Sequence, residues 1–69
     1  MKDIRIEKDG KAYILAARMT ENRFFWLFTI YEVDPTINRI IYMLGKRTAM
    51  TPEEALLDVL KSQRPEEGV

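Results

Sequence analysis

The most apolar stretch of the chain is FFWLFTIYEV, residues 24–33. It is rich in aromatic and β-branched residues, which favour β-strands. In an extended chain successive side chains point to opposite faces, and here both faces are apolar. The two sets are Phe24, Trp26, Phe28 and Ile30 on one face, and Phe25, Leu27, Tyr31 and Val33 on the other. A strand that is apolar on both faces is usually covered on both faces. This stretch therefore predicts a strand that is covered on both faces.

A hairpin precedes this strand. In residues 2–8 the apolar Ile4 and Ile6 alternate with charged residues, as in a half-buried strand. Asp9-Gly10 follows, and Asp-Gly is a strong signal for a two-residue type I′ turn. The register that this turn predicts is Lys8 opposite Lys11, Glu7 opposite Ala12, Ile6 opposite Tyr13 and Ile4 opposite Leu15.

A second turn lies near Thr20–Arg23. With Glu21-Asn22 as its two-residue loop, Met19 is expected to face Phe24. The same register sets Ala17 opposite Trp26 and Leu15 opposite Phe28. Glu is a poor residue for the positive φ of such a loop, and a one-residue slip would move every side chain to the other face.

Asp34-Pro35 predicts the next turn, because proline presets φ at the second turn position. A fourth strand is expected from Arg39 to Leu44, with a continuation to Ala49 left open. Gly45 is expected either to end this strand or to lie in a β-bulge. The two predicted faces are Ile40, Tyr42 and Leu44, and Ile41 and Met43.

The last element is a helix with clear end signals. Thr51 is an N-cap, Pro52 occupies the first helical position, and Glu54 completes a capping box. Pro65 is expected to stop the helix. Its apolar stripe consists of Ala55, Leu56, Val59 and Leu60, widened by Leu57.

The order of elements is thus β-β-β-β-α, an α+β fold. The short connections predict a four-stranded antiparallel meander with one C-terminal helix packed on one face of the sheet. Residues 1–64 are interpreted as a single α+β domain. Residues 65–69 are interpreted as a flexible acidic tail, because they are polar and contain Pro and Gly.

Composition narrows the chemistry. The 69 residues include no cysteine and no histidine, so disulfides, imidazole bases and cysteine- or histidine-bound metals are excluded. We expect no catalytic, cofactor-binding or metal-binding residues, and therefore no enzyme. The longest fully apolar run is residues 24–28, too short to span a membrane. No signal-peptide pattern begins the sequence, so a cytoplasmic location and no membrane partner are expected.

One acidic pair has the chemistry of a cation site. Glu32 and Asp34 flank Val33 before a turn, and two carboxylates could contribute to a hard-cation site. Such a site needs more oxygen ligands than these two residues supply. The preferred interpretation is a pair of solvated charges at a strand end.

The uncovered sheet face suggests a function. One helix covers one face, which leaves an apolar patch larger than soluble monomers usually expose. A second copy of the chain is the commonest cover. We therefore expect a small non-enzymatic interaction domain that acts as a homodimer. The expected interface residues are Ile14, Phe25, Leu27, Tyr31, Ile41 and Met43.

Two other functions remain open. A sheet that interleaves basic and aromatic residues can bind single-stranded nucleic acid, and the basic candidates are Arg5, Lys8, Lys11, Arg18 and Arg23. The order of elements is similar to that of small ssDNA-binding transcriptional coactivators. No motif of that family occurs in this sequence, so none of the family's functional residues is assigned to a position here. The third alternative is a small monomeric inhibitor that docks on another protein. The net charge of zero makes nucleic acid the less favoured partner.

Overall fold

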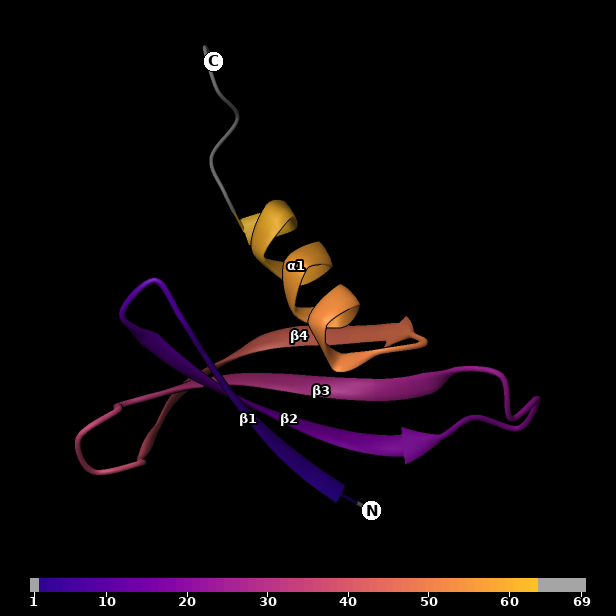
Figure 1. Ribbon diagram of the computed structural model, residues 1–69, viewed down its shortest axis with the longest axis horizontal. Helices are drawn as coiled ribbons and strands as arrows, with labels where there is room; N and C mark the ends of the chain where they lie inside the picture. Colours follow the sequence, from indigo (N-terminus) through magenta and orange to yellow (C-terminus); the bar gives the residue numbers. More distant parts are fainter. Residues whose placement is uncertain (1, 64–69) are drawn as a thin grey trace, which may run out of the picture.

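The computed structural model describes residues 2–63, which form a four-stranded antiparallel sheet followed by one helix (Figure 1). The strands lie in the order β1-β2-β3-β4, and α1 packs against β4 and β3. The predicted α+β meander is confirmed. Its elements are β1 Lys2–Lys8, β2 Lys11–Met19, β3 Trp26–Val33, β4 Ile40–Ala49 and α1 Pro52–Gln63. The acidic tail predicted at 65–69 lies outside the described residues.

The first hairpin forms as its turn chemistry predicts. Asp9 and Gly10 both have positive φ, 54° and 78°, as a type I′ turn requires. Lys8 pairs with Lys11 and Ile4 pairs with Leu15, so the predicted register is confirmed. The local turn therefore sets which side chains of both strands share a face.

The connection between β2 and β3 is longer than predicted. Met19 pairs with Trp26, so the predicted pairing with Phe24 is wrong by two residues. The loop closes through Thr20, whose backbone N–H and hydroxyl both donate to the carbonyl oxygen of Phe25, at 3.1 and 2.8 Å. Asn22 stabilises the loop interior by accepting from the backbone N–H of Phe24. Because the shift is even, every β3 side chain keeps its predicted face.

Strand β4 contains two β-bulges. Ile30 pairs with Gly45 and Tyr31 with Met43, which leaves Leu44 as an extra residue. Leu44 is buried in the core. The second bulge inserts Ile41 between the pairs Glu32–Tyr42 and Val33–Ile40. Ile40 therefore shares a face with Val33, and the prediction that it shares one with Tyr42 is wrong.

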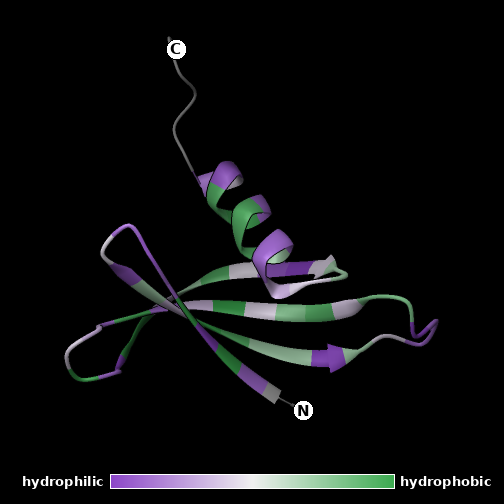
Figure 2. Cartoon of the chain, in the orientation of Figure 1, coloured by the Kyte–Doolittle hydropathy of each residue, from purple (hydrophilic) through white to green (hydrophobic). Residues whose placement is uncertain are grey.

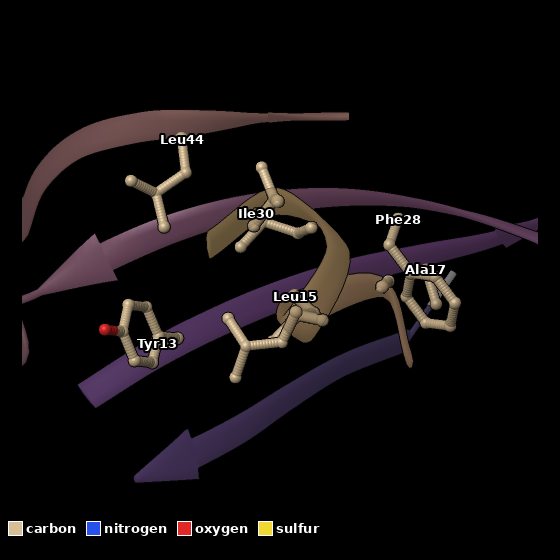
Figure 3. Close-up of a cluster of buried hydrophobic side chains, with 9 residues drawn as sticks. Tyr13, Leu15, Ala17, Phe28, Ile30 and Leu44 are labelled. Atoms are coloured by element: carbon tan, nitrogen blue, oxygen red, sulfur yellow. The ribbon is translucent and has the colours of Figure 1, made fainter. Parts of the chain in front are cut away.

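The helix begins at its predicted cap. The Thr51 hydroxyl accepts from the backbone N–H of Glu54 at 3.2 Å, and Pro52 is the first helical residue. The buried helix residues are Ala55, Leu56 and Val59. They pack over the core face of the sheet, where Tyr13, Leu15, Ala17, Phe28 and Ile30 lie (Figure 3).

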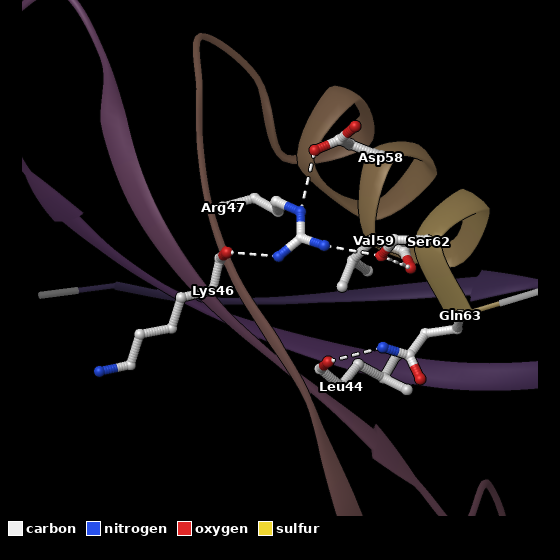
Figure 4. A network of polar contacts seen from close by, with 7 residues as sticks. All are labelled: Leu44, Lys46, Arg47, Asp58, Val59, Ser62 and Gln63. Atoms are coloured by element: carbon white, nitrogen blue, oxygen red, sulfur yellow. Dashed lines mark hydrogen bonds and ion pairs between the residues drawn. The ribbon is translucent and has the colours of Figure 1, made fainter.

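Polar contacts fix the position of α1 on β4 (Figure 4). The Arg47 guanidinium forms an ion pair with Asp58 at 2.9 Å and donates to the Ser62 hydroxyl at 2.6 Å. The Gln63 side-chain amide donates to the carbonyl oxygen of Leu44 at 3.1 Å. These contacts hold α1 over β4 and leave the opposite face of the sheet without a helix.

Candidate interaction surface

We call the sheet face opposite α1 the open face. The strand pairings align its side chains in rows, and Ile14 of β2, Tyr31 of β3 and Met43 of β4 form one row. These three are partly or largely exposed within the chain. The central open-face residues are Ile14, Ala16, Leu27, Thr29, Tyr31 and Met43.

Figure 2 shows hydrophobic residues along β3, which is one of the two inner strands of the sheet. Its helix side belongs to the core through Phe28 and Ile30. Its other side contributes Leu27 and Tyr31 to the open face, where both are only half-buried. The central strand is therefore apolar on both faces, as its sequence predicts, while α1 covers only one of them.

One end of the open face is closed by a polar bridge. Arg5 of β1 forms an ion pair with Glu7 and donates from Nε to the Asn38 side chain at 3.2 Å. Asn38 belongs to the loop between β3 and β4, so this contact crosses the ends of the two central strands. Ala12 and Val33, which pair at this end, are 0% and 1% exposed. The uncovered part of the open face is therefore its centre and its opposite end.

The structure brings together four of the six predicted interface residues, because Ile14, Leu27, Tyr31 and Met43 lie together on the open face. Phe25 does not lie on the sheet, since it ends the loop before β3. Ile41 is the inserted residue of a bulge and is about half-exposed. The predicted interface thus contains a compact centre and two outlying members.

The five basic candidates for nucleic acid binding lie in separate places. Arg5 is engaged with Glu7 and Asn38, while Lys8 and Lys11 flank the first turn. Arg18 lies on the open face opposite Leu27, and Arg23 lies in the β2–β3 loop. The fold therefore does not gather them into one continuous basic surface.

A groove of about 630 Å³ lies on the helix side of the sheet, between the first hairpin and the last turns of α1. Tyr13, Glu32 and Tyr42 form a row on its floor, and Leu57 and Leu60 line it from the helix. Lys8, Lys11 and Lys61 bring positive charge, which Asp9 and Glu32 partly offset. The groove is a mixed apolar and charged hollow.

The tyrosines of the groove have perturbed acidities. The Tyr42 hydroxyl donates to a Glu32 carboxylate oxygen at 2.9 Å, and this hydrogen bond raises the pKa of Tyr42 above its ordinary value. Burial, together with the negative charges of Glu32 and Asp9, raises the pKa of Tyr13. The Tyr42 phenol therefore holds its proton more tightly than a free tyrosine and is the hydrogen-bond donor to Glu32.

The acidic pair singled out in the sequence is divided between two roles. Glu32 accepts from Tyr42 on the helix side. Asp34 shapes the next loop by accepting from the backbone N–H of Thr36 at 2.8 Å. Within residues 2–63 no three acidic side chains are grouped so that they could hold a metal ion. In the same range no helix is long and apolar enough to cross a membrane.

Sequence reasoning missed two features of these surfaces. Ile37 was assigned to no element, yet it is more than half exposed in the loop before the bulged start of β4, and a single isoleucine between Thr36 and Asn38 gives no strand signal. Arg47 was not singled out, yet it joins β4 to α1. Its spacing of eleven residues from Asp58 carries no local pattern, so only the packed helix reveals the pair.

Comparisons of this chain with protein-family models, with curated proteins and with solved structures found no match.

Proposed function

We propose that this chain is a non-enzymatic protein-interaction domain that works as a homodimer through its open face. The observation that supports the proposal is the row Ile14–Tyr31–Met43, which is apolar and lacks a covering element within the described residues. Burying such a row removes apolar surface from water, which stabilises the complex by about 25 cal/mol per Å² of apolar surface buried. A second open face is an apolar partner of matching size.

The size of the face fits this role. Four strands spaced about 4.8 Å apart and about six residues long beyond the closed end present an uncovered face of roughly 19 by 20 Å. Side-chain relief makes its accessible area larger than this projection of roughly 400 Å². A standard protein interface takes about 800 Å² from each partner, so one open face is of the right order.

The size of the chain gives a second argument. A domain of fewer than roughly 70–80 residues rarely gains more than about 3–5 kcal/mol from its own core. The 69-residue chain has no cysteine and so gains nothing from a disulfide. Association of two copies would supply the missing burial.

Sedimentation equilibrium over about a hundredfold range of protein concentration tests this proposal. The expected result is a mass that rises from monomer to dimer, with a melting temperature that rises in parallel. Leu27→Lys and Met43→Lys should shift the equilibrium towards monomer, because each new ammonium would be buried in a row that holds an arginine and no acidic residue. The variant monomers should keep their β-sheet circular dichroism.

Leu57→Lys is the matched control for Met43→Lys. The two side chains are 48% and 52% exposed, but Leu57 lies on α1 and away from the open face. It should leave the dimer intact. A wild-type protein that stays monomeric at every concentration would contradict the proposal. Binding of that monomer to single-stranded DNA that weakens steeply with salt would favour the nucleic-acid alternative, and salt-insensitive binding to a protein would favour the inhibitor.

A further inference from the structure

The strand register points to the symmetry of this dimer. We propose that two open faces meet about a two-fold axis that runs parallel to the strands, so that Asp3 of each copy lies against Lys46 of the other. The inference rests on the proposed homodimer. It names the arrangement of the two copies and the charge pairs that select it.

Asp3 and Lys46 lie at opposite ends of one row. Asp3 pairs with Ala16, Ala16 with Thr29, and Thr29 with Lys46. Figure 4 shows the Lys46 side chain directed away from α1, whereas the neighbouring Arg47 reaches towards it. Asp3 alternates with Ile4, which packs against the core, so Asp3 is also on the open face.

These two charges are too far apart to pair within one chain. Three strand spacings separate them by about 14 Å, beyond the screening length of about 10 Å at moderate salt. Neither residue forms an ion pair among residues 2–63. Asp3 and Lys46 thus place one negative and one positive charge, both unpaired within residues 2–63, on the two edge strands of the open face.

A two-fold axis that lies between the two sheets and runs parallel to the strands places β1 of one copy over β4 of the other. Each row of one copy then lies over the same row of the other copy, with the order of its residues reversed. This holds for the row that begins with Asp3 and ends with Lys46. Each Asp3 then lies over the partner's Lys46, twice per dimer. Two sheets pack about 10 Å apart, a gap that the long lysine side chain bridges.

The other aligned arrangement has the axis perpendicular to the strands, and it pairs like charges. The Arg5–Asn38 bridge closes one end of the open face. The uncovered area then consists of the row of Arg18 and Leu27, the row of Asp3 and the row of Arg5 and Ile14, and the Asp3 row is the middle one. Reversing the rows about that centre puts Asp3 over Asp3 and Lys46 over Lys46. Like charges brought together cost binding energy, so the parallel axis is favoured.

The parallel axis also gives a well-matched centre. Ala16 and Thr29, the small residues of the Asp3 row, fall on either side of the axis, so the two backbones can approach closely. In the next row Ile14 of one copy lies over Tyr31 of the other. Aromatic and β-branched side chains form favourable pairs in such contacts.

Charge reversal tests this arrangement. Lys46→Asp should set two aspartates against each other at both ends of the row and raise the dimer dissociation constant about tenfold. Asp3→Lys should weaken the dimer similarly, and the double variant Asp3→Lys/Lys46→Asp should restore the wild-type constant. Sedimentation equilibrium at low and high salt is the measurement, and high salt should lessen the defect of each single variant.

Lys61→Asp is the control, because Lys61 lies on α1 and should leave the dissociation constant unchanged. Circular dichroism melts of the diluted Asp3 and Lys46 variants should match that of the wild type, since both altered side chains are exposed. A stable dimer that ignores both single reversals would overturn the proposed axis and leave the homodimer standing. A double variant as weak as the sum of the single variants would overturn it too. A wild-type chain that never dimerises would instead contradict the proposed function.

Discussion

Gly45 of β4 lies directly against Val59 of α1. A Cβ atom on Gly45 would come within 3.3 Å of Val59 Cγ2 and within 3.3 Å of Arg47 Nη1. The φ of Gly45 is 152°, a backbone conformation that other residues rarely adopt. The bulge that places Leu44 in the core and the contact that seats the helix therefore depend on the same residue.

Gly45→Ala should destabilise the protein by about 1–3 kcal/mol, because it adds backbone strain and crowds the helix contact. Denaturant unfolding of a dilute sample measures the change. Thr48→Ala, at an exposed β4 position, should stay within about 0.5 kcal/mol of the wild type. Equal stability of all three proteins would mean that the helix does not approach β4 at Gly45.

Two phenylalanines distinguish the observed β2–β3 connection from the predicted two-residue loop. Phe28 is 1% exposed in the core, and Phe24 is 76% exposed in the loop. Phe28→Ala should cost about 3–5 kcal/mol, whereas Phe24→Ala should change stability by no more than about 0.5 kcal/mol. Thermal melts of the two variants provide the comparison. A large loss in Phe24→Ala would support the shorter loop, in which Phe24 faces Met19.

The helix cap predicts a graded response. Thr51→Ala removes the acceptor for the Glu54 backbone N–H and should cost about 0.5–2 kcal/mol. For a domain of this size the change corresponds to several degrees of melting temperature. Thr51→Ser keeps the hydroxyl and should melt close to the wild type. If alanine and serine behaved alike, the hydroxyl would not be the source of the stabilisation.

The tyrosine pair predicts a loss of stability at alkaline pH. The pKa values of Tyr13 and Tyr42 are raised in the folded protein, so the folded state holds these protons more tightly than the unfolded state. Their contribution is therefore complete below the ordinary tyrosine pKa of about 10 and disappears as the pH rises through the higher folded values. Denaturant unfolding at a series of pH values measures this slope.

Tyr42→Phe removes the hydrogen bond to Glu32 and should flatten the alkaline slope. Tyrosinate absorbance should show in parallel that one high-pKa group has been lost. A slope that the substitution leaves unchanged would assign the alkaline sensitivity to other groups.

Local sequence signals are sufficient to specify several elements of the fold. Asp9-Gly10 specified its turn and, through it, the register of β1 and β2, because positive φ at both positions allows little else. Thr51, Pro52 and Glu54 specified the start of α1 through the cap. The alternation in residues 26–33 assigned each β3 side chain to its face, and an even change of register could not alter that assignment.

Features that depend on distant residues follow from tertiary packing. The β2–β3 loop is longer than its turn signal predicts, because Thr20 closes it on Phe25 and β3 pairs with β2 only from Trp26 onwards. The bulge at Leu44 and the Arg47–Asp58 pair exist because β4 must accommodate a helix that lies close to Gly45. The four open-face residues come together only when three strands are in register, since residues 14 and 43 are far apart in the chain and become neighbours of Tyr31 through backbone pairing alone.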